Sequence, residues 1–265
     1  MKLHEVWTSL VLICFSTVTA NRLSLLKNVD DFMNTCMDGQ NHKLQPGPEE
    51  LQFQTCFPWK DRACCSKDVT AEFQSPGVTK WLGFEWNHCG GMTEKCRKHF
   101  IQDLCFYECS PNVGPWLVKD SDREWRKERM FEVPLCESEC LTWWDDCKEE
   151  MTCLDNWMRG FNWTTGTNTC PDDMKCQPFK DMFKDHRRFC EQVWDFSYKV
   201  VPDGDDNCFK LWFDPKDYNG SNPNDAVARK KAQAYTILLS SNLATLICIP
   251  VVSVVAGLLS AIVLL

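Results

Sequence analysis

The sequence predicts a disulfide-rich globular α+β domain, with several helices and long loops and a few short strands. Two observations indicate this fold class. Cysteines recur almost without a gap through the middle of the 265-residue chain, and helical periodicity is clearer than any strand pattern. Uncharged apolar segments occupy both ends of the chain. We expect one cysteine-rich, ligand-binding domain between them, over residues 21–214.

The first 20 residues are typical of a secretory signal peptide. A basic start precedes an apolar stretch from Val6 to Val18, and the small residue Ala20 stands just before a plausible cleavage point. An N-terminal membrane anchor is the alternative, but the apolar stretch is shorter than the roughly 20 residues that a bilayer requires. The mature chain is therefore expected to begin at Asn21.

The C-terminal tail, residues 243–265, carries no charged side chain and is long enough to cross a hydrocarbon core of about 30 Å. A conventional spanning helix usually has Lys or Arg on its cytoplasmic side, and none follows here. The pattern favours a tail that is removed and replaced by a GPI anchor. Residues 215–242 are then a stalk with the attachment region, either at Ser240 to Asn242 or nearer Ala232 or Ala234.

The cysteine count predicts eight disulfides. Of 18 cysteines, Cys14 and Cys248 lie in the two apolar ends, and an even number in an oxidising compartment indicates complete pairing. A metal cluster is the alternative, yet the sequence has no C-x-x-C pair and no histidine at zinc-finger spacing, so we expect no metal. Spacing leaves the connectivity open. The predicted disulfide cysteines are Cys36, Cys56, Cys64, Cys65, Cys89, Cys96, Cys105, Cys109, Cys136, Cys140, Cys147, Cys153, Cys170, Cys176, Cys190 and Cys208.

Two further features bear on the class of protein. The sequons that begin at Asn162 and Asn219 predict glycosylation and fit an exported surface protein. The formal net charge of −8, with no long basic run, argues against nucleic acid as a partner.

Helical periodicity is clearest from Thr93 to Tyr107, where aromatic, aliphatic and cysteine side chains recur every three or four residues. Further helices are expected over residues 137–146 and 177–194, and a loop over residues 38–50. Cysteines four residues apart on one helical face can reach different partners. Cys105 and Cys109 form one such pair, and Cys136 and Cys140 form another.

Strand signals are weak. Residues 196–201 and 208–213 are rich in β-branched and aromatic side chains, and a turn-forming Pro202-Asp203-Gly204 lies between them. This pattern predicts a small hairpin.

Aromatic residues are the first sign of function. Twelve Trp and sixteen Phe are many for a domain of this size, and several Trp stand beside polar or charged neighbours. Aromatic walls with a few polar groups are how a protein holds a flat heteroaromatic ligand. The alternative is that these side chains fill a sparse core, and for any single Trp that alternative is the stronger one.

Several stretches resemble the folate receptor family, and the resemblance covers nearly the whole mature chain, including the order of its cysteines. The same superfamily contains riboflavin-binding proteins and Juno, an egg-surface sperm receptor. The matching stretches are residues 99–103 (HFIQD), 107–112 (YECSPN), 114–116 (GPW), 125–129 (WRKER), 133–136 (VPLC), 156–157 (NW), 197–200 (SYKV) and 212–215 (WFDP).

The resemblance implies that Asp103 lies at the closed end of a deep pocket and accepts two hydrogen bonds from the pterin ring of folate. A carboxylate presents two oxygens at the spacing of the ring N–H and the exocyclic NH₂, which gives a charge-assisted bidentate contact. By sequence alone, an Asp on a helix is usually a solvated surface charge. This role therefore depends on the resemblance.

The other ligand contacts are implied in the same way. Arg126 and Arg129 would bond the carbonyl side of the pterin, and Ser197 would add a hydroxyl contact. If they lie on a helix or turn, the two arginines could face one ligand; a solvated ion-pair network with Asp122 and Glu128 is the alternative. Stacking side chains would enclose the ring and line the pocket farther out: Tyr107 and Trp194, then Trp125, Trp157 and Trp163.

Departures from the family concentrate at the implied pocket mouth. Met158 stands in place of His, Arg159 in place of Lys, Phe161 in place of Trp, and Leu82 in place of a stacking Tyr. Arg159 keeps a positive charge for the glutamate tail of folate. Met158 and Phe161 each remove a potential N–H donor, and a lost hydrogen bond is worth roughly 0.5–1.5 kcal/mol. Trp81 could replace the missing wall.

The sequence shows no nucleophile elbow, catalytic Cys–His pair or metal-activated water, so a binding protein is expected rather than an enzyme, with folate as ligand and no cofactor. The resemblance implies a GPI-anchored receptor on the extracellular face of the plasma membrane. It would bind folic acid and reduced folates, carry them into endosomes and release them on acidification. The alternative is an egg-surface adhesion receptor for a sperm protein, which leaves a gamete or other cell-surface partner open.

Overall fold

The computed structural model describes residues 22–51, 54–72, 77–123, 126–204 and 206–241. The predicted signal peptide, the predicted apolar tail and Trp125 lie outside these ranges. Within them, no helix combines the length and the apolar composition that crossing a bilayer requires.

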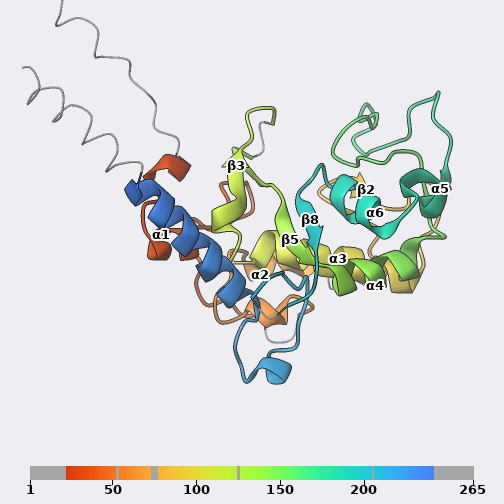
Figure 1. Ribbon diagram of the computed structural model, residues 1–265. Coiled ribbons are helices and arrows are strands. Elements are labelled where there is room, and N and C mark those ends of the chain that lie inside the picture. Colours follow the sequence, from red (N-terminus) through yellow and green to blue (C-terminus); the bar gives the residue numbers. More distant parts are fainter. Residues whose placement is uncertain (1–21, 52–53, 73–76, 124–125, 205, 242–265) are drawn as a thin grey trace, which may run out of the picture.

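A central helix, α3 (Glu94–Cys109), confirms the strongest periodicity in the sequence. The Thr93 hydroxyl caps its first turn by accepting a hydrogen bond from the Cys96 amide. The helix ends at Cys109 because Ser110 precedes a proline and adopts the extended conformation that this position favours. α3 packs against a second long helix, α4 (Glu137–Cys147), as Figure 1 shows.

The helical prediction for residues 177–194 is confirmed as two short helices rather than one. After a strand, β7 (Gln177–Pro178), the chain forms α5 (Phe179–Phe183) and then α6 (His186–Gln192), which packs on α4. Lys184 separates the two helices because its φ of 74° belongs to the left-handed region, which ends a right-handed helix.

The core is aromatic and gathers around Phe100 of α3. The ring of Trp157 stacks on Phe100 at 5.0 Å between centroids, and Trp143 of α4 meets it edge-on at 5.1 Å. Phe189 of α6 packs edge-on against Trp143 at 5.1 Å. Much of the Trp and Phe content therefore forms core packing between helices.

Among the described residues the strands form four two-stranded ladders, and three of them are antiparallel. The antiparallel pairs are β1 (Lys80–Trp81) with β2 (Phe84–Glu85), β3 (Leu117–Lys119) with β4 (Glu128–Met130), and β6 (Met151–Thr152) with β7. The fourth pair is parallel and joins β5 (Val133–Cys136) to β8 (Tyr198–Val201). With the helices and long loops, these ladders confirm the predicted α+β class.

The predicted hairpin between residues 196–201 and 208–213 is wrong. β8 pairs in parallel with one edge of β5. Phe209 forms a bridge to the opposite edge of β5, where the Phe209 amide donates a hydrogen bond to the Pro134 carbonyl at 2.6 Å. Both segments pair with β5 because this buried apolar strand offers two edges, and the Cys136–Cys208 disulfide ties the second segment to its end.

The remaining elements surround this centre. Residues 38–50, predicted as loop, contain isolated bridges at Gly39 and Gly47 and no helix or longer strand. The short elements are η1 (Arg22–Leu25), α1 (Val29–Met33), η2 (Phe57–Trp59), α2 (Lys67–Ala71), η4 (Gly114–Trp116) and η5 (Pro215–Tyr218).

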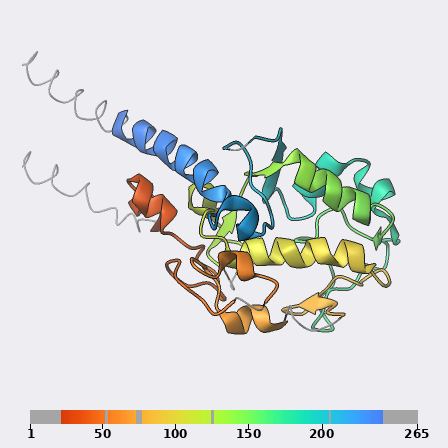
Figure 2. The same cartoon turned by 90° about the horizontal axis from the view of Figure 1, so that it is seen from below.

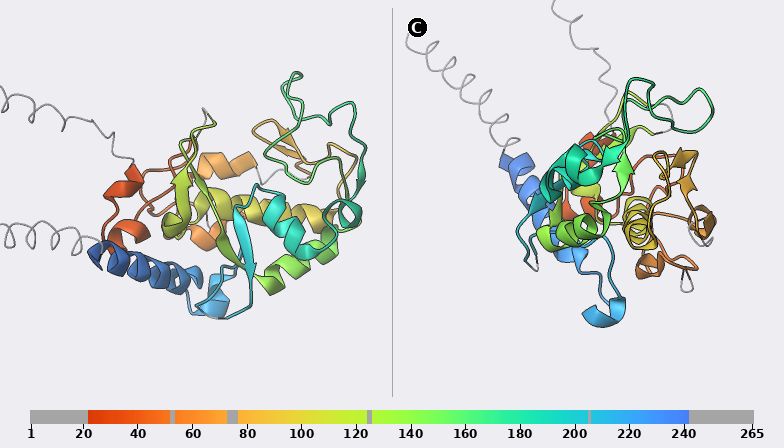
Figure 3. Two further views of the ribbon diagram at one scale, coloured as in Figure 1. Left: turned by 45° about the horizontal axis from the view of Figure 1, so that its top comes forward. Right: turned by 90° about the vertical axis from the view of Figure 1, so that its right-hand side faces the viewer.

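A helix over residues 224–241 occupies most of the segment that we predict to be a stalk. Its Ala228 and Ala232 are fully buried, and the ring of Tyr235 stacks on Phe32 of α1 at 5.7 Å. Figures 2 and 3 show this helix, in blue, beside the N-terminal elements at one end of the molecule. The lipid attachment point in this region remains a prediction.

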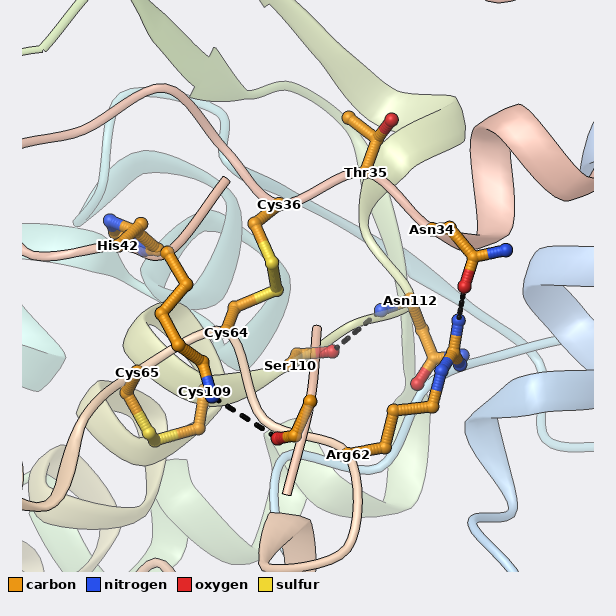
Figure 4. Close-up of a disulfide and its surroundings, with 12 residues drawn as sticks. Asn34, Thr35, Cys36, His42, Arg62, Cys64, Cys65, Cys109, Ser110 and Asn112 are labelled. Carbon is orange, nitrogen blue, oxygen red and sulfur yellow. Dashed lines mark hydrogen bonds between the residues drawn. A yellow bond between two sulfur atoms is a disulfide. The ribbon is translucent and has the colours of Figure 1, made fainter. Parts of the chain in front are cut away.

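The described residues contain eight disulfides, which confirms the number predicted from the cysteine count. Cys105 and Cys109 of α3 bond Cys56 and Cys65, so neighbouring cysteines on one helix do reach different partners. Figure 4 shows the consecutive Cys64 and Cys65 tying two segments together. The pairs are Cys36–Cys64, Cys56–Cys105, Cys65–Cys109, Cys89–Cys176, Cys96–Cys147, Cys136–Cys208, Cys140–Cys190 and Cys153–Cys170.

Candidate functional site

A cavity of about 610 Å³ lies along one face of α3. Small-molecule sites in proteins typically measure about 300–1,000 Å³, so this one suits a ligand of drug or vitamin size. The lining combines aromatic walls with a few polar groups. It consists of Gly39, Gln40, Asn41, His42, Trp81, Leu82, Phe84, Trp86, Asp103, Leu104, Tyr107, Glu108, Arg123, Arg126, Met130, Trp157, Met158, Trp163, Trp194, Ser197 and Tyr198.

Asp103 projects from α3 into this cavity and is only 3% exposed. The hydroxyl of Tyr198 donates a hydrogen bond to its Oδ1 at 2.6 Å. Burial raises the pKa of Asp103 to about 7, because desolvation penalises the charged form, while Tyr198 and Trp194 act in the opposite direction. A carboxylate oxygen can accept more than one hydrogen bond, so Asp103 retains capacity for a ligand.

Tyr198 also lines the cavity, although the sequence did not predict it there. It is the first residue of β8, and its pairing with Val133 of β5 directs the side chain into the interior. Alternating burial along Tyr198–Val201 is the signal that could have placed it. Its neighbour Ser197 also lines the cavity, where the Ser197 hydroxyl donates to the Trp194 carbonyl at 2.8 Å.

The two predicted arginines lie in different surroundings. Arg126 lines the cavity, and its guanidinium donates to Asp120 at 2.6 Å and to the Tyr107 hydroxyl at 3.2 Å. Arg129 lies outside that lining and donates to the Asp195 carbonyl at 2.8 Å. Arg129 belongs to strand β4, not to a helix or turn, yet both arginines line a smaller cavity that adjoins the large one.

Aromatic side chains line the cavity around its polar groups. Trp157, Trp163 and Trp194 line the cavity as the resemblance implies, and Phe84 of β2 lies among them. The ring centroid of Phe84 is 5.7 Å from that of Trp157, 5.8 Å from that of Trp194 and 6.2 Å from that of Trp163. Phe84 was not expected. The arrangement forms walls between which a flat ring can stack.

The residues predicted at the mouth divide into two groups. Met158 and the half-exposed Trp163 line the cavity, and so do Leu82 and Trp81 of the β1–β2 turn region. The other two residues lie outside the lining.

Arg159 forms a bidentate ion pair with Asp195, at 3.1 Å from Nε and 3.0 Å from Nη2. Phe161 is buried with its ring against Phe84 and His88. Neither residue lines the cavity in this structure. The site role of both remains a prediction, as does that of Trp125.

A second buried acid, Glu108, lines the same cavity and was not expected. It lies one residue beyond Tyr107 on α3, and its Oε2 is 3.6 Å from Nε2 of His42. Burial raises the pKa of Glu108 to about 8 and lowers the pKa of His42 to about 4. Both side chains are therefore mainly uncharged at neutral pH, and they add hydrogen-bonding groups to the cavity wall.

Comparison with known proteins identifies the family. The model of the folate receptor family matches residues 35–210. The chain belongs to the folate receptor family. It is 45% identical to human folate receptor alpha over 206 residues, which cover 77% of this chain and 78% of the relative. It is 40% identical to human folate receptor gamma over 233 residues, covering 86% and 93%.

A riboflavin-binding protein from Dromaius novaehollandiae is also similar. The two chains are 30% identical over 184 residues, which cover 69% of this chain and 73% of the relative. The chain is thus also similar to a protein whose name records a different vitamin. Any functional proposal for this chain has to separate the two ligands by experiment.

Proposed function

We propose that this chain is a cell-surface receptor that binds folate and reduced folates with high affinity and delivers them into the cell by endocytosis. The buried carboxyl of Asp103, in a cavity with aromatic walls, carries the proposal. Identity of 40–45% to two folate receptors supports it.

The chemistry of the cavity suits a pterin ring. Asp103 can accept the ring N–H and the exocyclic NH₂ together, and Arg126 and Ser197 supply donors on the same lining. Tyr107 and Trp194 offer faces against which the ring can stack. An aromatic ring with several nitrogens needs both kinds of contact, because its faces are apolar and its edge is polar.

Acidification supplies the release step. Ionised Asp103 accepts ligand N–H groups, whereas the protonated carboxyl places a donor opposite those donors. Its pKa of about 7 in the unliganded protein means that the protonated form is dominant at endosomal pH. Ligand affinity should therefore fall by up to about tenfold for each pH unit below about 7.

The decisive experiment is calorimetric titration of the secreted domain with folic acid, with riboflavin as the competing ligand. We expect tight binding of folic acid at neutral pH, weaker binding at about pH 5 and little binding of riboflavin. Riboflavin binding without folate binding would contradict the proposal. An egg-surface adhesion function is not proposed, because Asp103 and Arg126, to which the proposal assigns the pterin contacts, both line the cavity.

The proposal includes a GPI anchor, and glycans at Asn162 and Asn219. Both asparagines are exposed, which glycosylation requires. Treating expressing cells with phosphatidylinositol-specific phospholipase C should release the protein from the surface. Enzymatic deglycosylation should lower its apparent mass, and an Asn162→Gln, Asn219→Gln double variant should show no such change.

A further inference from the structure

Two consecutive residues between Trp194 and Ser197 have a left-handed backbone. The φ angle is 54° at Asp195 and 60° at Phe196, in a region that few residues other than glycine occupy. Such a conformation persists only where the surrounding contacts hold it in place. Because Trp194 and Ser197 both line the large cavity, the contacts that hold this turn also fix the position of two lining residues.

Backbone hydrogen bonds provide the first of these contacts. The amides of Asp195 and Phe196 donate to carbonyl groups of α6 at 3.0 and 2.9 Å, and the Glu132 amide donates to the Phe196 carbonyl at 2.9 Å. The carbonyl of Asp195 accepts from the Arg129 guanidinium at 2.8 Å. Arg129, which the resemblance implies as a ligand contact, therefore contacts the backbone of the turn.

The carboxylate of Asp195 joins this turn to a second segment of the site. Its Oδ1 accepts a hydrogen bond from the Asn156 side-chain amide at 2.8 Å. Its Oδ2 accepts from Nε and Nη2 of Arg159 at 3.1 and 3.0 Å. Between these two partners in the sequence stand Trp157 and Met158, which line the large cavity. One carboxylate therefore uses both oxygens to connect two segments that form the site.

The connection between the two segments governs how two aromatic lining residues face each other. The ring centroids of Trp157 and Trp194 are 5.5 Å apart, and their planes are at 89°. One backbone hydrogen bond, from the Trp157 amide to the Val193 carbonyl at 2.9 Å, also joins the segments. A single bond leaves rotation about itself possible, and the two sets of contacts at Asp195 remove that freedom.

The Asp195 carboxylate is ionised at endosomal as well as at neutral pH. Burial acts to raise its pKa, but the hydrogen bonds from Arg159 and Asn156, with the charges of Arg159 and Arg129, leave the pKa of Asp195 below its usual value. These contacts therefore persist at the pH at which the protonated form of Asp103 is dominant.

We propose that Asp195 is a positioning residue of the large cavity, and that Arg159 acts on the ligand only through the Asp195 carboxylate. This inference rests on the proposed folate-binding function. The carboxylate holds Trp194 in place relative to Trp157, so the ligand ring meets walls that are already arranged before it binds. The resemblance implies instead that Arg159 contacts the glutamate tail of folate directly. The two roles predict different results for a ligand that has no such tail.

Calorimetric titration with pteroic acid, which has no glutamate, and with folic acid, which has one, separates these roles. In Arg159→Gln and in Asp195→Asn, we expect affinity for both ligands to fall by the same factor, about three- to tenfold. Asparagine tolerates the left-handed backbone well, so Asp195→Asn removes the charge without adding strain. The double variant should lose about as much as either single variant, because both substitutions break the same contact.

Arg187→Gln is the matched control for Arg159→Gln. Arg187 lies on α6, forms an ion pair with Glu137 and lines neither cavity, so its replacement should leave both affinities unchanged. All titrations are made well below the melting temperature of each variant. Under that condition, a residue that only stabilises the fold changes neither affinity.

Three results would overturn the positioning role while folate binding stands. They are a loss confined to folic acid in Arg159→Gln, unchanged affinities in Asp195→Asn, and losses that add in the double variant. Failure of the unaltered protein to bind either pteroic or folic acid would instead overturn the proposed function, and the positioning role with it.

Discussion

The hydroxyl of Tyr198, on β8, donates a 2.6 Å hydrogen bond to Oδ1 of Asp103, on α3, inside the large cavity. Burial raises the pKa of Asp103 to about 7, and this hydrogen bond limits the rise because it favours the ionised carboxyl. Tyr198 therefore helps to set the fraction of Asp103 that is ionised, and ready to bind a ligand, at neutral pH.

Removing that hydroxyl should move the pH dependence of binding. In Tyr198→Phe, the pKa of Asp103 should rise further, so the midpoint of the fall in folate affinity should shift to higher pH. At neutral pH we expect affinity to fall by about three- to tenfold, and at about pH 9 to recover most of the loss. Titration across this range measures both effects. Tyr218→Phe, at a tyrosine outside the cavity, is the control, and an unmoved midpoint in Tyr198→Phe would contradict the coupling.

Asp103→Asn should weaken folate binding and stabilise the unliganded protein. The amide loses one acceptor and gains a donor, so affinity should fall by about 100-fold or more. The folded pKa of Asp103 lies above its unfolded value, so its contribution to stability is fully present below about pH 4 and is lost as pH rises through about 7.

A neutral amide avoids that loss. We expect Asp103→Asn to gain about 1–3 kcal/mol in the free energy of unfolding at pH 8 and nothing at pH 4, measured by urea denaturation. Glu108→Gln is the matched variant, because burial raises the pKa of Glu108 to about 8 on the same helix. It should gain stability in the same pH range without losing the Asp103 carboxyl. A loss of stability at pH 8 in Asp103→Asn would contradict the assignment.

Substitutions of two cavity tryptophans should distinguish effects on folate affinity from effects on the stability of the fold. Trp157 is 2% exposed, and its ring stacks on Phe100 in the core, so Trp157→Ala should cost about 3–5 kcal/mol in unfolding free energy. Trp163 is 47% exposed at the mouth, so Trp163→Ala should leave the melting temperature nearly unchanged while weakening folate binding by about three- to tenfold. Equal destabilisation by both substitutions would show that Trp163 is also structural.

The Cys153–Cys170 disulfide closes the segment that carries Met158 and Trp163. Its cysteines are 17 residues apart, and a loop of that length predicts a cost of about 3 kcal/mol when the bridge is removed. We expect the Cys153→Ser, Cys170→Ser double variant to melt at lower temperature and to bind folate less tightly. Removing Cys36–Cys64 instead should lower stability while affecting the mouth less. A double variant of Cys153 and Cys170 with full affinity would argue that packing alone shapes the mouth.

Features with a local cause could be predicted from the sequence. The span of α3 follows from periodicity within the helix, a threonine cap directly before it and a proline just after it. Complete cysteine pairing follows from an even count, although the connectivity depends on the fold. The predicted hairpin failed because a third segment, β5, competes for both of its strands, and nothing local to residues 196–213 records that.

The candidate site shows the same limit. The resemblance supplied Asp103, Tyr107 and Trp194, which the fold brings to one cavity. Tyr198 and Glu108 were not predicted, although each directly follows a predicted site residue. Whether such a neighbour also points into the cavity depends on the register of β8 and on the rotation of α3 about its axis, which the sequence does not record. Arg129 was placed with Arg126 on the assumption of a helix or turn; it lies on a strand instead, and only Arg126 lines the large cavity, although both line a smaller cavity beside it.

The docked helix of residues 224–241 also constrains how the domain can be presented. Ala228 and Ala232 are buried, and Tyr235 stacks on Phe32 of α1, so the helix cannot swivel independently of the domain. Any group attached beyond this helix is therefore joined to the domain through a packed helix rather than through a flexible linker. Packing within the protein therefore sets the direction in which this helix leaves the domain.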